Sequence, residues 1–216
     1  MKTREEIVQL MTRLDEAYPT DEKCYLYYEK PWQLLIATIL SAQCTDARVN
    51  QVTEGLFRKY LNLEAFAEAD AHELEEDVKP TGFYHVKARH IIGTAQKLLS
   101  GFAGEELPSD MDSLTSLPGV GRKTANLIRG HVFGFPSVIV DTHVKRISFR
   151  LGLTSSLIPE KIETDLRGIL PEEHWTRYNM QIIAHGRAVC LARSPRCGRC
   201  VLREFCDWPA GETSRV

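Results

Sequence analysis

The sequence predicts an all-α protein, and three features support this prediction. Apolar residues recur at intervals of three and four along most of the 216 residues, which is the spacing of one face of an α-helix. Residues that favour helix starts, such as Thr3, Asp110 and Asp141, stand just before several of these segments. Residues 138–140 resemble a short strand, but the chain offers no alternating partner for them, so we expect an extended connector there.

Four segments in the first part of the chain are predicted to be helical. A T-x-x-E capping box at residues 3–6 indicates the start of the first helix. Pro31 opens the second, whose apolar residues surround the helix, so it should be buried. The third is expected to begin at Thr45 or Asp46. Residues 64–77 contain seven acids among alanines, and we expect a solvated helix face and nothing more.

Turn-forming residues divide the next part of the chain. The expected elements are, in order, a break at 80–82, a helix that includes 88–99, a loop at 101–108, a short helix from the cap Asp110 to Leu117, a glycine turn at 118–121 and a helix from Arg122.

The composition is that of an ordinary globular protein, with 43% hydrophobic and 26% charged residues. The most apolar early stretch, residues 34–40, is far shorter than the ~20 residues of a membrane-spanning helix, so no membrane partner is expected. Residues 1–20 carry charges in a helical pattern, unlike a secretory signal. We therefore expect a cytoplasmic protein, whose six cysteines are better explained as ligands or free thiols than as disulfides.

The net charge of −2 conceals an uneven distribution along the chain. Residues 1–110 hold 12 Lys and Arg against 19 Asp and Glu, a balance of −7, whereas residues 111–216 hold 15 against 10, a balance of +5. Because binding of a polyanion depends on the local field, the second half is compatible with contact to a nucleic acid.

Two glycines stand immediately before a predicted helix, in the segment Leu117-Pro118-Gly119-Val120-Gly121-Arg122-Lys123-Thr124. Glycine permits a positive φ and a close approach of the backbone to a phosphate, while the free N–H groups and the dipole of the helix favour negative charge. The turn therefore predicts an anion site. A glycine corner between two helices with no ligand fits the same residues equally well.

Four cysteines near the C-terminus have the spacing C-x6-C-x2-C-x5-C: Cys190, Cys197, Cys200 and Cys206. Four thiolates can close one metal site. The compact run differs from the separated C-x2–4-C pairs of structural zinc sites, but spacing alone leaves zinc and an iron–sulfur cluster both open. Cys24 and Cys44 lie outside this spacing and are expected to be small buried apolar groups.

Two longer motifs and several short ones point to one family. They are LPGVGRKTAN at 117–126, VDTHV at 140–144, LSAQ at 40–43, Thr45-Asp46, GFY at 82–84 and the four terminal cysteines. Together they resemble the endonuclease III family of bifunctional DNA glycosylases and abasic-site lyases, and the similarity covers nearly the whole chain. The resemblance implies an all-α helix-hairpin-helix glycosylase fold, with two helical lobes around a DNA-binding cleft and a C-terminal loop that carries a [4Fe-4S] cluster on the four cysteines.

The resemblance also implies a domain organisation and a set of partners. Residues 24–136 would form a six-helix barrel-like domain with the helix-hairpin-helix, and residues 1–23 with 137–216 would form the cluster domain. The partner would be double-stranded DNA with a damaged base or an abasic site, bound by a monomer that is associated with the nucleoid if the protein is bacterial.

Two residues carry the chemistry that the resemblance implies. Lys123 would be the nucleophile and Asp141 its acidic partner across the cleft. An amine that attacks the sugar C1′ can expel the base and form a Schiff base, which then permits β-elimination of the 3′ phosphate. Without the resemblance, Lys123 can equally be interpreted as a solvated lysine in the first turn of a helix. Asp141 can likewise be interpreted as a helix N-cap.

Further residues are expected to hold the DNA. One phosphate would be bound by the turn of Gly119, Val120 and Gly121. The gap left by the extruded nucleotide would be filled by Gln43 and Phe83. Phe83 is a departure, because an aliphatic wedge is more usual in the family, and a core aromatic is the alternative for it. Members of the family often have a basic residue at the position of Ser194. At the position of His85 they more commonly have a residue other than histidine.

Five arginines and no acid lie in the cysteine loop between residues 187 and 203. Arg193 and Arg196 are the expected phosphate contacts in it. The alternative is that the arginines screen a negatively charged cluster.

The expected reaction is removal of an oxidised or ring-saturated pyrimidine from duplex DNA, followed by strand cleavage. Monofunctional adenine or mismatch glycosylases have similar hairpins, but they typically lack a lysine at position 123. A second alternative is a non-catalytic helix-hairpin-helix module with a structural metal, which would be a colourless zinc protein.

Overall fold

The computed structural model describes residues 2–20, 24–102 and 106–209, and within these ranges it is helical and contains no β-strand. The all-α prediction is therefore confirmed. The chain divides into two compact units, a central unit of Cys24–Gly134 and a terminal unit of Met1–Lys23 with Phe135–Val216. In the described ranges, no helix combines the length and the apolar character that crossing a bilayer requires.

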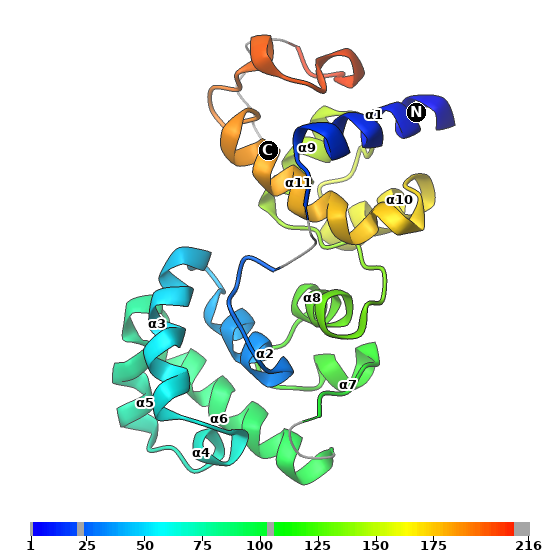
Figure 1. Cartoon of the computed structure of the whole chain (residues 1–216). Coiled ribbons are helices and arrows are strands. Elements are labelled where there is room, and N and C mark those ends of the chain that lie inside the picture. Colours follow the sequence, from blue (N-terminus) through cyan, green and yellow to red (C-terminus); the bar gives the residue numbers. More distant parts are fainter. Residues whose placement is uncertain (1, 21–23, 103–105, 210–216) are drawn as a thin grey trace. The chain divides into compact units, whose positions relative to one another are not determined.

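The central unit is built around a buried helix, α2 (Pro31–Leu40), which packs against α3, α6 and α8. Every residue of α2 after Pro31 is buried, as its all-round apolar pattern predicts. The other elements of the unit (Figure 1) are α3 (Asp46–Lys59), α4 (Leu63–Ala67), α5 (Ala71–Val78), the 3-10 helix η1 (Lys79–Thr81), α6 (Tyr84–Gly101), α7 (Met111–Thr115) and α8 (Arg122–Phe133). The helix expected to reach Leu117 thus ends two residues earlier, at Thr115.

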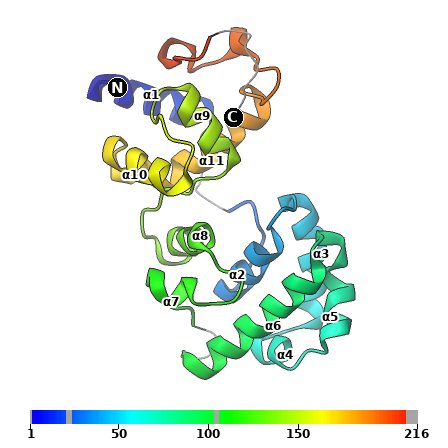
Figure 2. The ribbon, with the colours of Figure 1, turned by 180° about the vertical axis from the view of Figure 1, so that it is seen from behind.

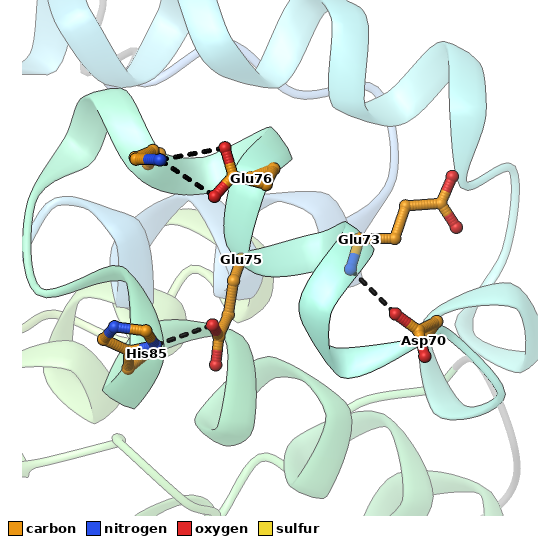
Figure 3. A network of polar contacts seen from close by, with 6 residues as sticks. Asp70, Glu73, Glu75, Glu76 and His85 are labelled. Carbon is orange, nitrogen blue, oxygen red and sulfur yellow. Dashed lines mark hydrogen bonds and ion pairs between the residues drawn. The ribbon is translucent and has the colours of Figure 1, made fainter.

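The acidic segment 64–77 is solvated as expected, since five of its seven acids are exposed, but it is not one continuous helix. It forms two helices, because the side chains of Asn62 and Asp70 each cap a new start, at α4 and at α5. Both helices bury apolar side chains, among them Phe66 and Leu74, and both pack against α6. The acids themselves make ordered contacts, and Figure 3 shows one of them, between Glu75 and His85 at 2.6 Å.

The α-helices in the described part of the terminal unit can be followed in both views of the ribbon (Figures 1 and 2): α1 (Arg4–Ala17), α9 (Thr142–Arg150), α10 (Pro159–Ile169) and α11 (Trp175–Ala188). The capping box is confirmed, since the hydroxyl of Thr3 accepts from the N–H of Glu6 at 3.2 Å and the Glu6 carboxylate accepts from the N–H of Thr3. Helix α11 packs against α1 and α9. The apolar faces of these helices form the core of the unit.

The terminal unit also contains the short 3-10 helices η2 (Glu172–His174), η3 (Cys197–Arg199) and η4 (Arg203–Phe205). The expected connector at 138–140 is extended and joins no strand among the described residues, as predicted. Its position is held by Asn179, whose side-chain amide donates to the carbonyl of Ile139 at 3.0 Å.

Candidate functional site

The glycine turn between α7 and α8 requires glycine at one of its two positions. Gly119 has a φ of +75°, and a Cβ on it would lie 2.6 Å from Nδ1 of His90. Gly121 has a φ of −90°, and a Cβ on it would meet nothing within 4 Å. The turn is fastened to α6, because the hydroxyl of Thr94 donates to the carbonyl of Pro118 at 2.9 Å. The positive φ expected of the hairpin glycines is therefore a property of Gly119 alone.

Helix α8 begins at this turn with its N-terminus open. Gly121 is the N-cap residue, and no side chain among the described residues caps the helix there. An α-helix leaves the N–H groups of its first turn without intrahelical acceptors, and its dipole favours an anion at this end. Val120 differs from its neighbours, because it is buried and its N–H is donated to the carbonyl of Leu117. The arrangement can hold one phosphate through the backbone on the α8 side.

Lys123 is the second residue of α8 and is exposed. Within the described part of the central unit, its amine makes no hydrogen bond or ion pair, so nothing there would have to be broken before it reacted. This placement agrees with a solvated lysine in the first turn of a helix. It agrees equally with a nucleophile in the substrate-free enzyme.

Asp141 is the N-cap of α9 in the terminal unit. Its Oδ1 accepts a hydrogen bond from the N–H of Val144 at 2.7 Å, and the residue is half-buried. The predicted capping role is therefore confirmed. A carboxylate has two oxygens, so the cap leaves acceptor capacity for a second task.

Gln43 and Phe83 share an unusual backbone conformation. Their φ angles are 55° and 50°, and they are the two non-glycine residues with positive φ in the part of the chain that the structure describes. Such strain persists where the surroundings impose it, and it is often associated with function. Both side chains are exposed, and that of Phe83 is 64% accessible. The alternative of a core aromatic is therefore wrong for Phe83.

The four terminal cysteines lie in one neighbourhood of the terminal unit. Burial raises the pKa of Cys200 to about 11, and the nearby thiols of the other three act in the same direction. A thiol held protonated in this way releases its proton when it binds a metal. Cys24 and Cys44 lie elsewhere, half-buried against the core of the central unit, which agrees with the apolar role expected for them.

The four thiols of the cysteine loop are the donors that a four-iron cluster takes, one thiolate at each iron. Zinc takes the same donors, so the loop alone does not distinguish the two metals that its spacing left open.

Buried basic groups surround these thiols. Arg150 is 2% exposed and donates to Sγ of Cys190 at 3.0 Å and to the carbonyls of Leu191 and Ala192 at 2.9 Å. His185 is also buried, and its Nε2 lies 3.5 Å from Sγ of Cys200. The guanidinium of Arg150 would orient and partly neutralise a thiolate. Burial lowers the pKa of His185 to about 4, so its neutral ring would only orient one.

The arginines of the loop point outward. All five are exposed: Arg187, Arg193, Arg196, Arg199 and Arg203. Arg196 uses one guanidinium nitrogen to donate to the carbonyl of Ala188 at 3.2 Å, which steadies the loop. The loop therefore presents accessible positive charge, as predicted.

Sequence reasoning missed three buried cations, Lys87, Arg146 and Arg150. Lys87 is 3% exposed and donates from Nζ to the carbonyls of Leu40 and Thr81, each at 2.7 Å. The available signal was a charged residue in the apolar stripe of a helix, since Lys87 stands four residues before the buried Ile91.

Two family models match the chain. Residues 36–172 match the HhH-GPD superfamily of base excision DNA repair proteins, and residues 190–206 match the iron–sulfur binding domain of endonuclease III. Endonuclease III of Synechocystis sp. is 47% identical over 98% of this chain and 95% of the relative. The Escherichia coli K12 enzyme is 38% identical over 93% of this chain and 94% of its own length.

Solved structures agree with these matches. A trapped endonuclease III–DNA covalent intermediate has a TM-score of 0.88 at 41% identity and covers 96% of this chain and 97% of its own. A thermostable thymine-DNA glycosylase shares the fold, with a TM-score of 0.81 at 21% identity over 94% of this chain and 96% of its own. The resemblance and the [4Fe-4S] cofactor inferred from the motifs are confirmed. The chain belongs to the endonuclease III family, within the HhH-GPD superfamily of base excision DNA repair proteins.

Proposed function

We propose that this chain excises oxidised or ring-saturated pyrimidines from duplex DNA and then cleaves the strand at the abasic site through a lysine Schiff base. The observation that carries the proposal is the exposed amine of Lys123 in the first turn of α8, directly after the open helix N-terminus at Gly121. A relative that is 41% identical was trapped as a covalent intermediate with DNA. The enzyme would act as a monomer in the cytoplasm, at the nucleoid if the cell is bacterial.

Lys123 would do the covalent chemistry. Its neutral amine attacks C1′ of the damaged nucleotide, the N-glycosidic bond breaks, and the base leaves with a proton. The nitrogen lone pair then breaks the bond between C1′ and the ring oxygen O4′, which takes a proton as it leaves, and this gives a protonated imine to C1′. Loss of a proton from C2′ then breaks the bond between C3′ and the phosphate oxygen. Water finally hydrolyses the imine and regenerates the lysine.

Asp141 would assist at two points. The Oδ1 atom is occupied by the N–H of Val144, which holds the carboxylate in one orientation. The remaining acceptor capacity would take the proton from the amine of Lys123 and stabilise the positive charge that develops on the sugar.

The DNA would be held through its backbone and opened by two side chains. Gly119, Val120 and Gly121 form the turn where one phosphate would bind the first N–H groups of α8. Exposed Gln43 and Phe83 would enter the duplex and replace the contacts that the extruded nucleotide gives up.

The cluster loop would form the remaining contact with the DNA. We propose that Cys190, Cys197, Cys200 and Cys206 ligate the [4Fe-4S] cluster, which when bound supplies four iron–sulfur bonds that cross-link the loop. The exposed guanidinium groups of Arg193 and Arg196 would then contact phosphates from a rigid support.

Borohydride trapping on a duplex with one thymine glycol tests the nucleophile. Borohydride reduces the imine to a stable amine, so the wild type should become covalently attached to DNA, whereas Lys123→Gln should not. Lys161→Gln is the matched control, because Lys161 is also an exposed lysine in the first turn of a helix, α10. Equal trapping of Lys123→Gln and wild type would show that another amine reacts.

A further inference from the structure

Lys87 is a buried cation that the proposed chemistry does not use. It lies in the first turn of α6 and is 3% exposed. Burial lowers the pKa of its ammonium, while the nearby thiol of Cys44 acts in the opposite direction. A buried ammonium is costly unless its donors are satisfied, and here they meet two backbone carbonyls at 2.7 Å.

These two carbonyls belong to segments that are far apart in the sequence. Leu40 is the last residue of α2, and Thr81 is the last residue of η1. A helix leaves its final carbonyls without intrahelical donors, and they form the negative end of its dipole. The ammonium of Lys87 therefore joins the C-terminal ends of two helices, across 47 and 6 residues of sequence.

Each of these helix ends leads directly to a strained residue. Gln43 follows Leu40 by three positions, and Phe83 follows Thr81 by two. These are the two positive-φ residues noted above. Additional hydrogen bonds hold the segments: the Ser41 hydroxyl donates to the carbonyl of Thr38 at 2.8 Å, and the Thr81 hydroxyl donates to that of Val78 at 2.7 Å.

We propose that Lys87 is a positioning residue that fixes the turn bearing Gln43 and the turn bearing Phe83 relative to each other, so that both side chains enter the duplex together. This inference rests on the proposed roles of Gln43 and Phe83. Strained backbone persists only where neighbouring structure imposes it. A methionine would fill the same space without the cost of burying a charge, but it has no donor to join the two carbonyls.

Two substrates separate positioning from folding. Filling the gap in a duplex matters only when an opposite strand is present, so an abasic site in single-stranded DNA does not need Gln43 or Phe83 to be aligned. Lys87→Met should reduce excision from a thymine-glycol duplex by about a hundredfold, the scale expected for misplacement by about 1 Å. Cleavage of the single-stranded abasic site should change less than about threefold, well below that scale.

The control for stability is Ile91→Val, which removes a methyl group from the core one turn further along α6 and leaves both carbonyl contacts intact. This variant should lower the melting temperature and affect both substrates equally. If Lys87→Met does not fold, Lys87→Arg can replace it. Arginine keeps the positive charge but places its donor nitrogens differently relative to the two carbonyls, so the same duplex-selective loss is expected. An equal loss on both substrates for the Lys87 variant would overturn the proposal.

A double-variant background decides whether Lys87 acts through these side chains. When Gln43 and Phe83 are both alanine, adding Lys87→Met should cause little further loss on the duplex. A full, additive loss there would also overturn the inference. If the Gln43→Ala and Phe83→Ala changes leave duplex excision unaffected, the proposed roles of those two residues fail instead. If they reduce it and Lys87→Met does not, only the role of Lys87 fails.

Discussion

The carboxylate of Asp141 accepts a hydrogen bond from the backbone N–H of Val144 at 2.7 Å, so the residue proposed to assist Lys123 also starts helix α9. The two tasks need different properties of the side chain. Capping needs only an acceptor oxygen, which asparagine also supplies, whereas proton transfer and stabilisation of a cation need the carboxylate charge.

Asp141→Asn is therefore predicted to keep the stability of the protein and lose its excision activity. We expect a change of a few tenths of a kcal/mol in unfolding free energy and a fall in excision of about 10²-fold or more. Asp141→Ala should lose the activity in the same way and should also lower the unfolding free energy by about 1 kcal/mol, because alanine cannot cap the helix. Thermal melts and single-turnover excision measure the two effects. Asp110→Asn is the control, because Asp110 caps α7 through Ser113 at 2.8 Å and has no proposed chemical role; the interpretation fails if both variants lose activity equally.

The two hairpin glycines are predicted to respond differently to alanine. Gly119→Ala must adopt φ +75° and approach His90, so we expect a loss of at least about 1–2 kcal/mol in unfolding free energy. Gly121→Ala meets no steric obstacle, so its melting temperature should stay close to that of the wild type. It should nevertheless weaken DNA binding, because the methyl group would stand where a phosphate approaches the backbone. Unchanged affinity for Gly121→Ala would argue against a phosphate at this position.

Arg150 is predicted to retain the cluster. Arg150→Met removes the buried donors to Cys190 Sγ and to the carbonyls of Leu191 and Ala192. An acceptor that loses its donor costs up to about 1–3 kcal/mol where it is shielded from water, so the loop should loosen and lose iron. The visible absorption of the cluster during incubation with a chelator measures this loss. Arg167→Met, an exposed arginine on α10, should lose iron at the wild-type rate, and equal rates for all three proteins would contradict the prediction.

The arginines of the cluster loop are predicted to contribute to DNA affinity through their charge alone. Each phosphate contact contributes about 0.9 to the slope of log affinity against log salt. Changing both Arg193 and Arg196 to Gln should lower that slope by about 2, without altering lesion preference. Arg58→Gln, at an exposed ion pair with Glu54 in the central unit, should leave the slope unchanged. A slope that stays constant in the double variant would show that these guanidinium groups do not contact DNA.

Local features were predictable because their partners lie within one helical turn. Thr3, Thr45, Asp110 and Asp141 all cap helices as expected, since each accepts from an N–H three residues ahead. The buried state of α2 followed from its all-round apolar composition. The acids of segment 64–77 are mostly exposed as predicted, but its few apolar residues also pack on α6, a contact that the acid-rich composition did not indicate.

The sequence by itself determined the helix starts, the glycine turn, the spacing of the four thiols and, through its motifs, the family. Tertiary structure alone decided that Phe83 is exposed on a strained backbone, that Lys87 joins two helix ends, and that Arg150 reaches Cys190. The physical reason is distance along the chain: Lys87 and Leu40 are 47 residues apart, and Arg150 and Cys190 are 40. A buried cation is stable only with acceptors that folding brings to it, and no local pattern specifies which carbonyls those will be.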